Sequence, residues 1–381
     1  MTTTINNEHK KLNVPNLRFP EFQGEWKRTI FKNVITLQRG SSPRPIIEYV
    51  TTSDDGVNWI KIGDMPHFGR IVTSTEEKIT KEGAKKSRQV NKGDLILSNS
   101  MSYGLPYIMG IDGYIHDGWF VLKNFENTFD KDYLCNLLIS SAIQNQYKRL
   151  AAGGVVQNIS SDLVNSVSVS IPTMMEQKKI SSLLNLIDER IATQNKIIDK
   201  LQSLIKGIAQ KIVRNNKPNV RLTECLECKS STLQESEVCE QGTYPVYGAN
   251  GIVGYLDNYN TESEAVYIIK DGSGVGTVSY VTGKCSATGT LNTLQAKEGY
   301  SLHYLYYLLK VFNFEPYKTG MAIPHIYFKD YGKAKFFCPS YTEQLQYAQS
   351  LSAIDSKLLV EKNILTNLTL QKQYLLRQMF I

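Results

Sequence analysis

Two stretches of this chain open with the same pattern although they lie far apart. PTMMEQKKISSLLNLIDERI begins at Pro172, and PSYTEQLQYAQSLSAIDSKL begins at Pro339. Aligned without a gap, the two stretches share the proline, a Glu-Gln pair four and five residues later, and an aspartate at Asp188 and Asp355. A start that recurs at this distance predicts a tandem duplication, in which each copy follows a globular segment of its own.

Behind each start, apolar residues recur at alternating steps of four and three, which is typical of a helix covered by another helix. In the first copy the seam residues are Ile180, Leu184, Ile187, Ile191, Ile198 and Leu201, and in the second they are Leu351, Ile354, Leu358, Leu365 and Leu368. Gln194 and Glu361 interrupt the two seams at matching positions, whereas Lys372 stands where the first copy has Ile205.

The first seam continues to Ile212, so its helix would be roughly 50 Å long at about 1.5 Å per residue. The simplest cover for each seam is the other copy, which predicts an antiparallel coiled-coil pair with a globular segment at each end. The alternative is that each helix docks on its own domain, and the regular four-three spacing argues against it.

The globular segments contain short runs rich in Val, Ile, Tyr and Gly, which are typical of twisted β-sheets with turn glycines. We therefore expect an α+β fold with two β-rich domains in tandem, two long antiparallel helices between them, and pseudo-two-fold symmetry. The expected parts are an N-terminal arm (1–23), a first β-rich domain (24–171), a central helix (172–215), a second β-rich domain (216–338) and a C-terminal helix (339–381).

Composition narrows the function classes. No apolar run approaches the roughly 18 residues of a membrane span, and the N-terminus has no apolar signal segment, so we expect a cytoplasmic protein without membrane contact. The net charge is +7, and the whole excess of lysine and arginine lies in residues 1–215. A modest basic excess favours a phosphate-bearing partner. The alternative is that these basic side chains are simply solvated and bind no partner.

Catalytic and metal motifs are missing from the sequence. It contains no P-loop, no H-E-x-x-H, no G-x-S-x-G and no Asn/Asp-Pro-Pro-aromatic sequence. The glycine clusters GANGIVG and DGSGVG precede β-type runs rather than helices, so turns are expected there instead of a dinucleotide site. Cys225, Cys228 and Cys239 could supply part of a zinc site, but no suitable fourth ligand follows, so reduced thiols and no metal are expected.

A binding surface remains. Several loops combine glycine with Arg, Lys, Asn, Gln, Ser, Thr and Tyr, and such side chains suit hydrogen bonds to base edges and phosphates. Examples are QRGSSPRP, LSNSMSYG, GGVVQN, YGANG and KDGSG. KKSRQVNK (85–92) is the densest basic run and either binds phosphate or is simply solvated.

The repeated P-x-x-x-E-Q helices, the opening PNLRFPEFQGEWKRTIFKNV and the duplicated β-rich domains resemble the specificity (S) subunit of type I restriction–modification enzymes. The resemblance extends from about Asn13 through the rest of the chain, and the helix opening is its most specific mark. It implies a non-catalytic subunit whose two target recognition domains each read one half of a split DNA sequence. The helices would set the spacing and dock the modification subunits.

The resemblance also implies partners. These are double-stranded DNA, two modification (methyltransferase) subunits and two restriction (nuclease and translocase) subunits. The chain would bind no cofactor directly, and S-adenosylmethionine, ATP and Mg²⁺ would belong to the partner subunits. Loop position gives the candidate DNA contacts, which are Arg39, Ser41, Arg44, Lys61, Asn99, Ser100, Tyr103, Gly153, Gln157 and Asn158 in the first domain and Tyr247, Asn250, Lys270, Ser273, Thr288, Thr290, His325 and Tyr327 in the second. The alternatives are a protein-binding coiled-coil scaffold without DNA specificity and an enzyme whose active site carries no familiar motif.

Overall fold

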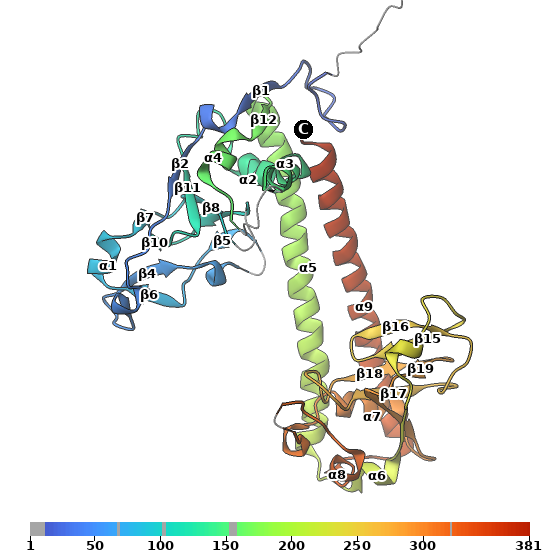
Figure 1. The fold of residues 1–381 in the computed structure, drawn as a ribbon. Helices are drawn as coiled ribbons and strands as arrows, with labels where there is room; N and C mark the ends of the chain where they lie inside the picture. Colours follow the sequence, from blue (N-terminus) through green and yellow to red (C-terminus); the bar gives the residue numbers. More distant parts are fainter. Residues whose placement is uncertain (1–11, 67–68, 101–103, 152–157, 321) are drawn as a thin grey trace, which may run out of the picture. The chain divides into compact units, whose positions relative to one another are not determined.

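The computed structural model describes residues 12–66, 69–100, 104–151, 158–320 and 322–381. The chain divides into two compact units. Unit 1 comprises Met1–Asn195 and Ile364–Ile381, and unit 2 comprises Lys196–Asn363. Each unit contains one β-rich domain and parts of two long helices, α5 (Met174–Asn215) and α9 (Tyr341–Gln378), which are coloured light green and red in Figure 1.

In the described part of unit 1, short strands form two five-stranded sheets, in the orders β3-β6-β4-β10-β7 and β2-β11-β8-β9-β5. The pairs β4–β10 and β5–β9 are parallel, and the other neighbours are antiparallel. A two-stranded sheet, β1-β12, joins the start of the domain to its end. The strands are β1 (Lys27–Ile30), β2 (Thr36–Arg39), β3 (Val50–Thr51), β4 (Val57–Ile60), β5 (Ile71–Val72), β6 (Glu77–Ile79), β7 (Arg88–Val90), β8 (Leu95–Ser98), β9 (Pro106–Met109), β10 (Gly113–Ile115), β11 (Trp119–Lys123) and β12 (Ser168–Ile171).

The main core of unit 1 joins the sheet to both long helices. It collects apolar side chains from β8, β11, the short helices and the first turns of α5, together with Leu375, Leu376, Met379 and Phe380 from the end of α9. The ring of Phe380 lies 5.3 Å from that of Tyr133. The short helices of the domain are α1 (Lys81–Lys85), α2 (Lys131–Ile139), α3 (Ser141–Ala151) and α4 (Ser161–Ser166).

In the described part of unit 2, the sheets have the orders β14-β20-β17-β18, β16-β15-β19 and β13-β21. Only β15–β19 is parallel among these pairs. The elements are β13 (Val220–Arg221), α6 (Leu222–Cys225), β14 (Leu226–Ser230), β15 (Tyr244–Gly248), β16 (Gly251–Leu256), β17 (Ala265–Ile269), β18 (Val278–Val281), β19 (Ser286–Ala287), β20 (Leu291–Ala296), α7 (Leu302–Leu309), α8 (Phe328–Tyr331) and β21 (Lys335–Phe336).

The repeated glutamine has the same task in both units. In unit 1, Gln177 accepts a hydrogen bond from the backbone N–H of Asp130 (2.9 Å) and donates to the carbonyl of Pro172 (3.1 Å). In unit 2, Gln344 accepts from the N–H of Ser301 (2.9 Å) and donates to the carbonyl of Pro339 (2.9 Å). Asp130 and Ser301 are the N-cap residues of α2 and α7. Each glutamine therefore ties the start of a long helix to the short helix of its own domain.

The seam residues of both long helices are covered. Ile180, Leu184, Ile187, Ile198, Leu351 and Leu358 are buried, and Ile191, Leu201, Ile354, Leu365 and Leu368 are half-buried. Within unit 1, the first half of α5 packs beside the last part of α9, which is the antiparallel arrangement expected from the repeat. The prediction of an α+β fold, with two β-rich domains each followed by a long helix and with the two helices packed together, is confirmed. No described helix has the length and hydropathy that a membrane span requires.

Candidate nucleic-acid interface

In the first domain, the turn at residues 115–119, called here the Asp117 turn, gathers several of the predicted contact residues. Arg39 Nε donates to the Asp117 carbonyl (3.3 Å), and Asn99 Nδ2 donates to the same oxygen (2.9 Å). Arg44 Nη2 lies 3.0 Å from Asp117 Oδ2. Residues from two separate loops, after β2 and after β8, therefore converge on one turn between β10 and β11.

Glycine allows the first of these loops to approach the turn. A Cβ at Gly40 would collide with the backbone carbonyl of His116, so a larger residue would push the loop away. The N–H of Ser41 then donates to the Ile115 carbonyl (3.3 Å), and the Ser41 hydroxyl donates to the Lys86 carbonyl (3.1 Å). Close backbone contact holds the following arginine at the rim of the turn.

The charge at the Asp117 turn is positive. Arg39, Lys86 and Arg88 are exposed, and the Arg44 side chain is 78% exposed. Burial raises the pKa of Asp117, but hydrogen bonds, led by the one from Ser42, and nearby positive charges lower it more, so its carboxylate stays ionised. Arg39, Arg44, Lys86 and Arg88 outnumber the carboxylates that act on this turn, Asp117 and Asp64, and an excess of positive charge suits phosphate.

The other candidate residues of the first domain differ in their position relative to the Asp117 turn. Ser100 and Asn158 form an isolated β-bridge next to Asn99, so both adjoin the Asp117 turn. Asn99 itself is buried, and its side chain is engaged with the turn. Lys61 follows Ile60, whose backbone pairs with Ile115 at the start of the turn, and its amine pairs with Glu77 (Nζ–Oε1 2.6 Å). Tyr103, Gly153 and Gln157 lie outside the described residues.

In the second domain, backbone hydrogen bonds join the predicted residues into one chain of contacts. Thr288 N–H donates to the Tyr247 carbonyl (2.9 Å), and Lys270 N–H donates to the Thr290 carbonyl (3.0 Å). The hydroxyls of Thr288 and Thr290 are 2.8 Å apart. Ile326 N–H reaches the Lys270 carbonyl (2.9 Å), which places the loop of His325 beside them. These residues, together with Asn250, Ser273 and Tyr327 from the same loops, are called here the second-domain patch.

Exposure sorts the residues of the patch. Asn250, Ser273 and Tyr327 are exposed, while Tyr247, Lys270, Thr290 and His325 are half-buried. Thr288 is only 1% exposed, so it holds the loops together and offers little to a partner. His325 Nδ1 lies 2.8 Å from Asp271 Oδ1, which fixes the orientation of the ring.

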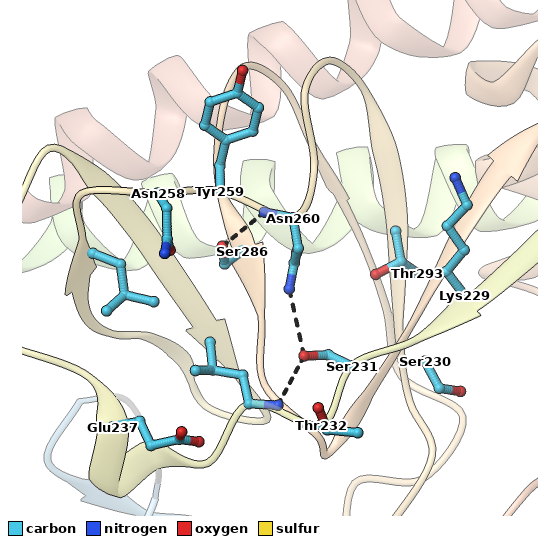
Figure 2. Close-up of a pocket in the computed structure, with 12 residues that line it drawn as sticks. Lys229, Ser230, Ser231, Thr232, Glu237, Asn258, Tyr259, Asn260, Ser286 and Thr293 are labelled. Atoms are coloured by element: carbon cyan, nitrogen blue, oxygen red, sulfur yellow. Dashed lines mark hydrogen bonds between the residues drawn. The ribbon is translucent and has the colours of Figure 1, made fainter.

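A polar hollow of about 610 Å³ adjoins the patch through residues 286–290 (Figure 2). Asn260 lies at its centre, where its N–H donates to Ser286 Oγ (3.0 Å) and its Nδ2 donates to Ser231 Oγ (3.4 Å). The Asn260 amide also pairs with both backbone groups of Ala287. Lys229, Ser230, Thr232, Asn258, Tyr259 and Thr293 also line it. The hollow thus presents donors and acceptors on a framework held by hydrogen bonds.

Sequence reasoning missed the residues of this hollow. Their signal is the stretch DNYN (257–260) together with KSST (229–232), because Asn, Ser, Thr and Tyr cluster in both. The first stretch continues the β-type run that follows GANGIVG, so its strand character masked its polar character. Ser42 and Asp117 were missed as well, since a lone aspartate in a turn carries no distinctive pattern.

Among the residues that the structure describes, no group of three or more His, Cys, Asp or Glu side chains is placed to hold a metal ion. The Cys225 thiol is instead hydrogen-bonded with the thiol of Cys338. This hydrogen bond and burial both raise the pKa of Cys225. Cys228 is half-buried and Cys239 is exposed.

Comparisons with known proteins identify the family. The model of the type I restriction modification DNA specificity domain matches residues 24–203 and again residues 216–370. The EcoprrI type I specificity subunit of Escherichia coli is 21% identical over 347 residues, covering 85% of this chain and 86% of that protein. The MjaVIII specificity subunit of Methanocaldococcus jannaschii is 24% identical over 212 residues, covering 53% of this chain and 48% of that protein.

Solved structures agree on the fold. The crystal structure of the type I restriction–modification S subunit from M. genitalium superposes with a TM-score of 0.62 at 19% identity, covering 97% of this chain and 99% of that chain. A chain from a study of complex assembly and conformational transition in the type I system gives a TM-score of 0.56 at 15% identity, with 92% and 96% covered. With the family model matching both halves and the two domains each leading into a long helix, this chain belongs to the specificity subunits of type I restriction–modification systems, which are non-catalytic and carry two target recognition domains.

Proposed function

We propose that each β-rich domain reads one half of a bipartite DNA target. The first domain (24–171) does so around the Asp117 turn, and the second (216–338) does so with its patch and the adjoining hollow. The observation that carries this proposal is the gathering of polar and basic loop residues at one place in each copy of a duplicated domain. Two short contacts separated by unread bases are the expected result of two readers in one chain.

The side chains divide by task. Arg39, Arg44, Lys86 and Arg88 are exposed cations at the Asp117 turn, which favours phosphate contacts that position the domain without reading sequence. Asn250, Ser273, Tyr327 and the hollow residue Asn258 offer amide and hydroxyl groups that suit base edges, while Asn260 holds the framework of the hollow. Lys61, whose amine is already paired with Glu77, ranks lowest among the first-domain candidates.

The long helices (172–215 and 339–381) would fix the gap between the half-sites and dock two modification subunits. Large apolar side chains remain exposed along both helices, among them Leu186 and Leu370 in unit 1 and Leu204 and Leu359 in unit 2. Within unit 1, a groove of about 830 Å³ lies between α5 and α9 and is lined by Leu183, Leu186, Ile187, Ile364 and Leu368 among others. Exposed apolar surface of this kind marks a protein-binding site.

The partners would supply the chemistry. The modification subunits bind S-adenosylmethionine and methylate adenine, and two restriction subunits use ATP and Mg²⁺ for translocation and cleavage in the cytoplasm. This chain then contributes recognition and geometry alone, and its N-terminal arm (1–23) belongs to the framework rather than to a reader. The target base leaves the DNA stack when it is methylated, and that distortion falls to the modification subunits.

The decisive experiment is single-molecule sequencing of genomic DNA from cells that carry the cognate modification subunit with or without this chain. A new N6-methyladenine motif in two parts, separated by unspecified bases, supports the proposal. Exchange of residues 24–171 for those of another specificity subunit should then change one part only. Soluble partners without any new methylation would overturn the proposal and favour a protein-binding scaffold.

A point test separates phosphate contacts from base contacts. Arg44→Gln should weaken binding of the assembled modification complex to all DNA sequences alike and lower the slope of log K against log salt by about 1. Tyr327→Phe or Asn258→Ala should instead relax specificity within the second half-site. A change of the first half-site by a second-domain variant would contradict the assignment of one half to each domain.

A further inference from the structure

Arg70 links the sheet of the first domain to the long helices. It precedes β5, the edge strand of the sheet β2-β11-β8-β9-β5, and its carbonyl accepts a hydrogen bond from Ile108 N–H in β9 (2.8 Å). Its guanidinium points away from the strand. Nη2 lies 3.0 Å from Asp188 Oδ2 on α5 and 2.5 Å from Asn136 Oδ1 on α2. The side chain of Arg70 thus contacts two helices, while its backbone bonds with β9.

Lys372 on α9 completes the cluster, because its Nζ bonds the other oxygen of Asp188. The side chains of Arg70, Asp188 and Lys372 are 17%, 31% and 18% exposed, so all three are largely withdrawn from solvent. Burial lowers the pKa of Lys372, and the bond to Asp188 opposes that effect. A single carboxylate therefore joins the sheet edge, α5 and α9.

Apolar packing does not fill the space around this cluster. A hollow of about 320 Å³ lies beside it, lined by Ile71 and Ile108 of the sheet, by Asp132 of α2 and by Ile191 and Ala192 of α5. Where side chains do not interdigitate, packing leaves the angle between two elements loosely defined. At this edge, the ion pairs add a directional constraint to the apolar core that joins the rest of the sheet to the helices.

The duplication shows that the helix pair itself does not require the cluster. Asp355 is the repeat counterpart of Asp188, and in unit 2 it accepts a hydrogen bond from the neutral Tyr307 hydroxyl of α7 (3.1 Å). Lys372 occupies the position that Ile205 occupies in the first helix, where Ile205 is buried. The charged arrangement is therefore an addition that is specific to unit 1.

We propose that the Arg70–Asp188–Lys372 cluster is a positioning device, in which Arg70 fixes the rotation of the first recognition domain on its helices and thereby the gap between the two half-sites. The proposal rests on the function proposed above. Arg70 touches no base in this scheme. It acts through the placement of the sheet, so its loss should change the distance between the two parts of the target and leave both parts readable.

Arg70→Met is the informative variant. Lys372 still neutralises Asp188 in this variant, so no carboxylate is left unpaired and folding should be preserved. The same genomic sequencing experiment then reports the gap directly. We expect both half-site sequences to be unchanged, while methylation at gaps one base longer or shorter rises about tenfold relative to the parental gap, as the loss of one link in a salt-bridge network allows. Arg70→Lys, which keeps one ion pair, should restore most of the parental preference.

Tyr307→Phe is the matched control, because it removes the corresponding bond to Asp355 and should leave the gap unchanged. If the parental chain produces no bipartite motif, the proposed function fails. If it does and Arg70→Met shows the parental gap preference, or loses methylation equally at all gaps, the positioning role is overturned. Hydrogen exchange of the assembled modification complex gives a second readout, since β5 and β9 should exchange faster in Arg70→Met. Unchanged exchange there would also overturn the role, and if Arg70→Met does not assemble, Arg70→Gln replaces it in both measurements.

Discussion

The two units use matching residues of the duplicated helices in different ways. Glu176 in unit 1 is buried and receives two bonds from Arg18 (2.7 and 2.8 Å) and one from Trp26 Nε1 (3.2 Å). Its counterpart in unit 2, Glu343, is exposed and accepts only from Ser340, the residue that caps its own helix. The adjacent glutamines, by contrast, share two backbone bonds in both units, to the N-cap of the short helix and to the preceding proline, and Gln177 adds one to the Thr128 carbonyl.

The difference indicates that contacts with backbone groups are kept in both copies of the duplication, whereas contacts with side chains are not. Gln177 and Gln344 bind backbone N–H and C=O groups, which remain available whatever the side chains become. Glu176 and Asp188 bind side chains of the N-terminal arm and of a sheet loop, and these are parts in which the two copies differ. Unit 1 has consequently acquired buried charge networks around its helices, where the matching carboxylates of unit 2 bond with a helix cap and a tyrosine hydroxyl.

The strongest test of the comparison removes Arg18. Arg18→Ala leaves the Glu176 carboxylate, whose side chain is 1% exposed, without its main partner, so local stability at the start of α5 should fall by about 3 to 5 kcal/mol. Glu343→Ala removes only an exposed capping contact and should cost about 1 kcal/mol. Native-state hydrogen exchange of the first turns of α5 and α9 measures both values. Equal losses would contradict the contrast between a buried and an exposed glutamate.

The second test asks whether the glutamines are equivalent. Gln177→Leu and Gln344→Leu each leave one N-cap N–H of α2 or α7 without its acceptor, so each should cost about 1 to 3 kcal/mol. The two losses should agree within about 0.5 kcal/mol, as hydrogen exchange in α2 and α7 would show. A large inequality would mean that one domain anchors its helix by other contacts.

The smallest expected effect is the loss of stability of unit 2 at acid pH, where His303 becomes protonated. In unit 2, His303 lies between the rings of Tyr280 (4.6 Å) and Tyr307 (5.3 Å), and burial lowers its pKa, although Glu264 and Asp355 oppose this. The unfolded chain therefore binds a proton below about pH 6.5 more readily than the folded one, and stability falls as pH falls through that range. His303→Phe should flatten this dependence, measured as the pH profile of hydrogen exchange in α7.

His116 in unit 1 is the natural control for the acid test. Burial lowers its pKa as well, with Asp117 opposing, so its own pH dependence has the same sign and should persist in His303→Phe. Loss of the acid response in both units on changing His303 alone would show that the response is not local.

The large features of the molecule follow from local sequence. The P-x-x-x-E-Q openings, the four-three spacing and the polar interruptions at Gln194 and Glu361 predict two long paired helices, because helix period and helix start depend on residues within a few turns. The same openings, with the duplicated domains, carry the resemblance to specificity subunits. Loop composition also singles out Arg39, Arg44, Lys270 and His325 as DNA contacts, and their role stays a prediction.

Tertiary structure alone decided which loops meet. Arg44 and Asp117 are 73 residues apart, Arg70 and Asp188 are 118 apart, and Asp188 and Lys372 are 184 apart. Such pairs depend on strand order, register and the path of each loop, and no periodic pattern records them. For the same reason, the hollow around Asn260 could not be predicted from the sequence. In the sequence Lys372 interrupts an apolar seam, and only the folded chain shows that Lys372 is the partner of Asp188.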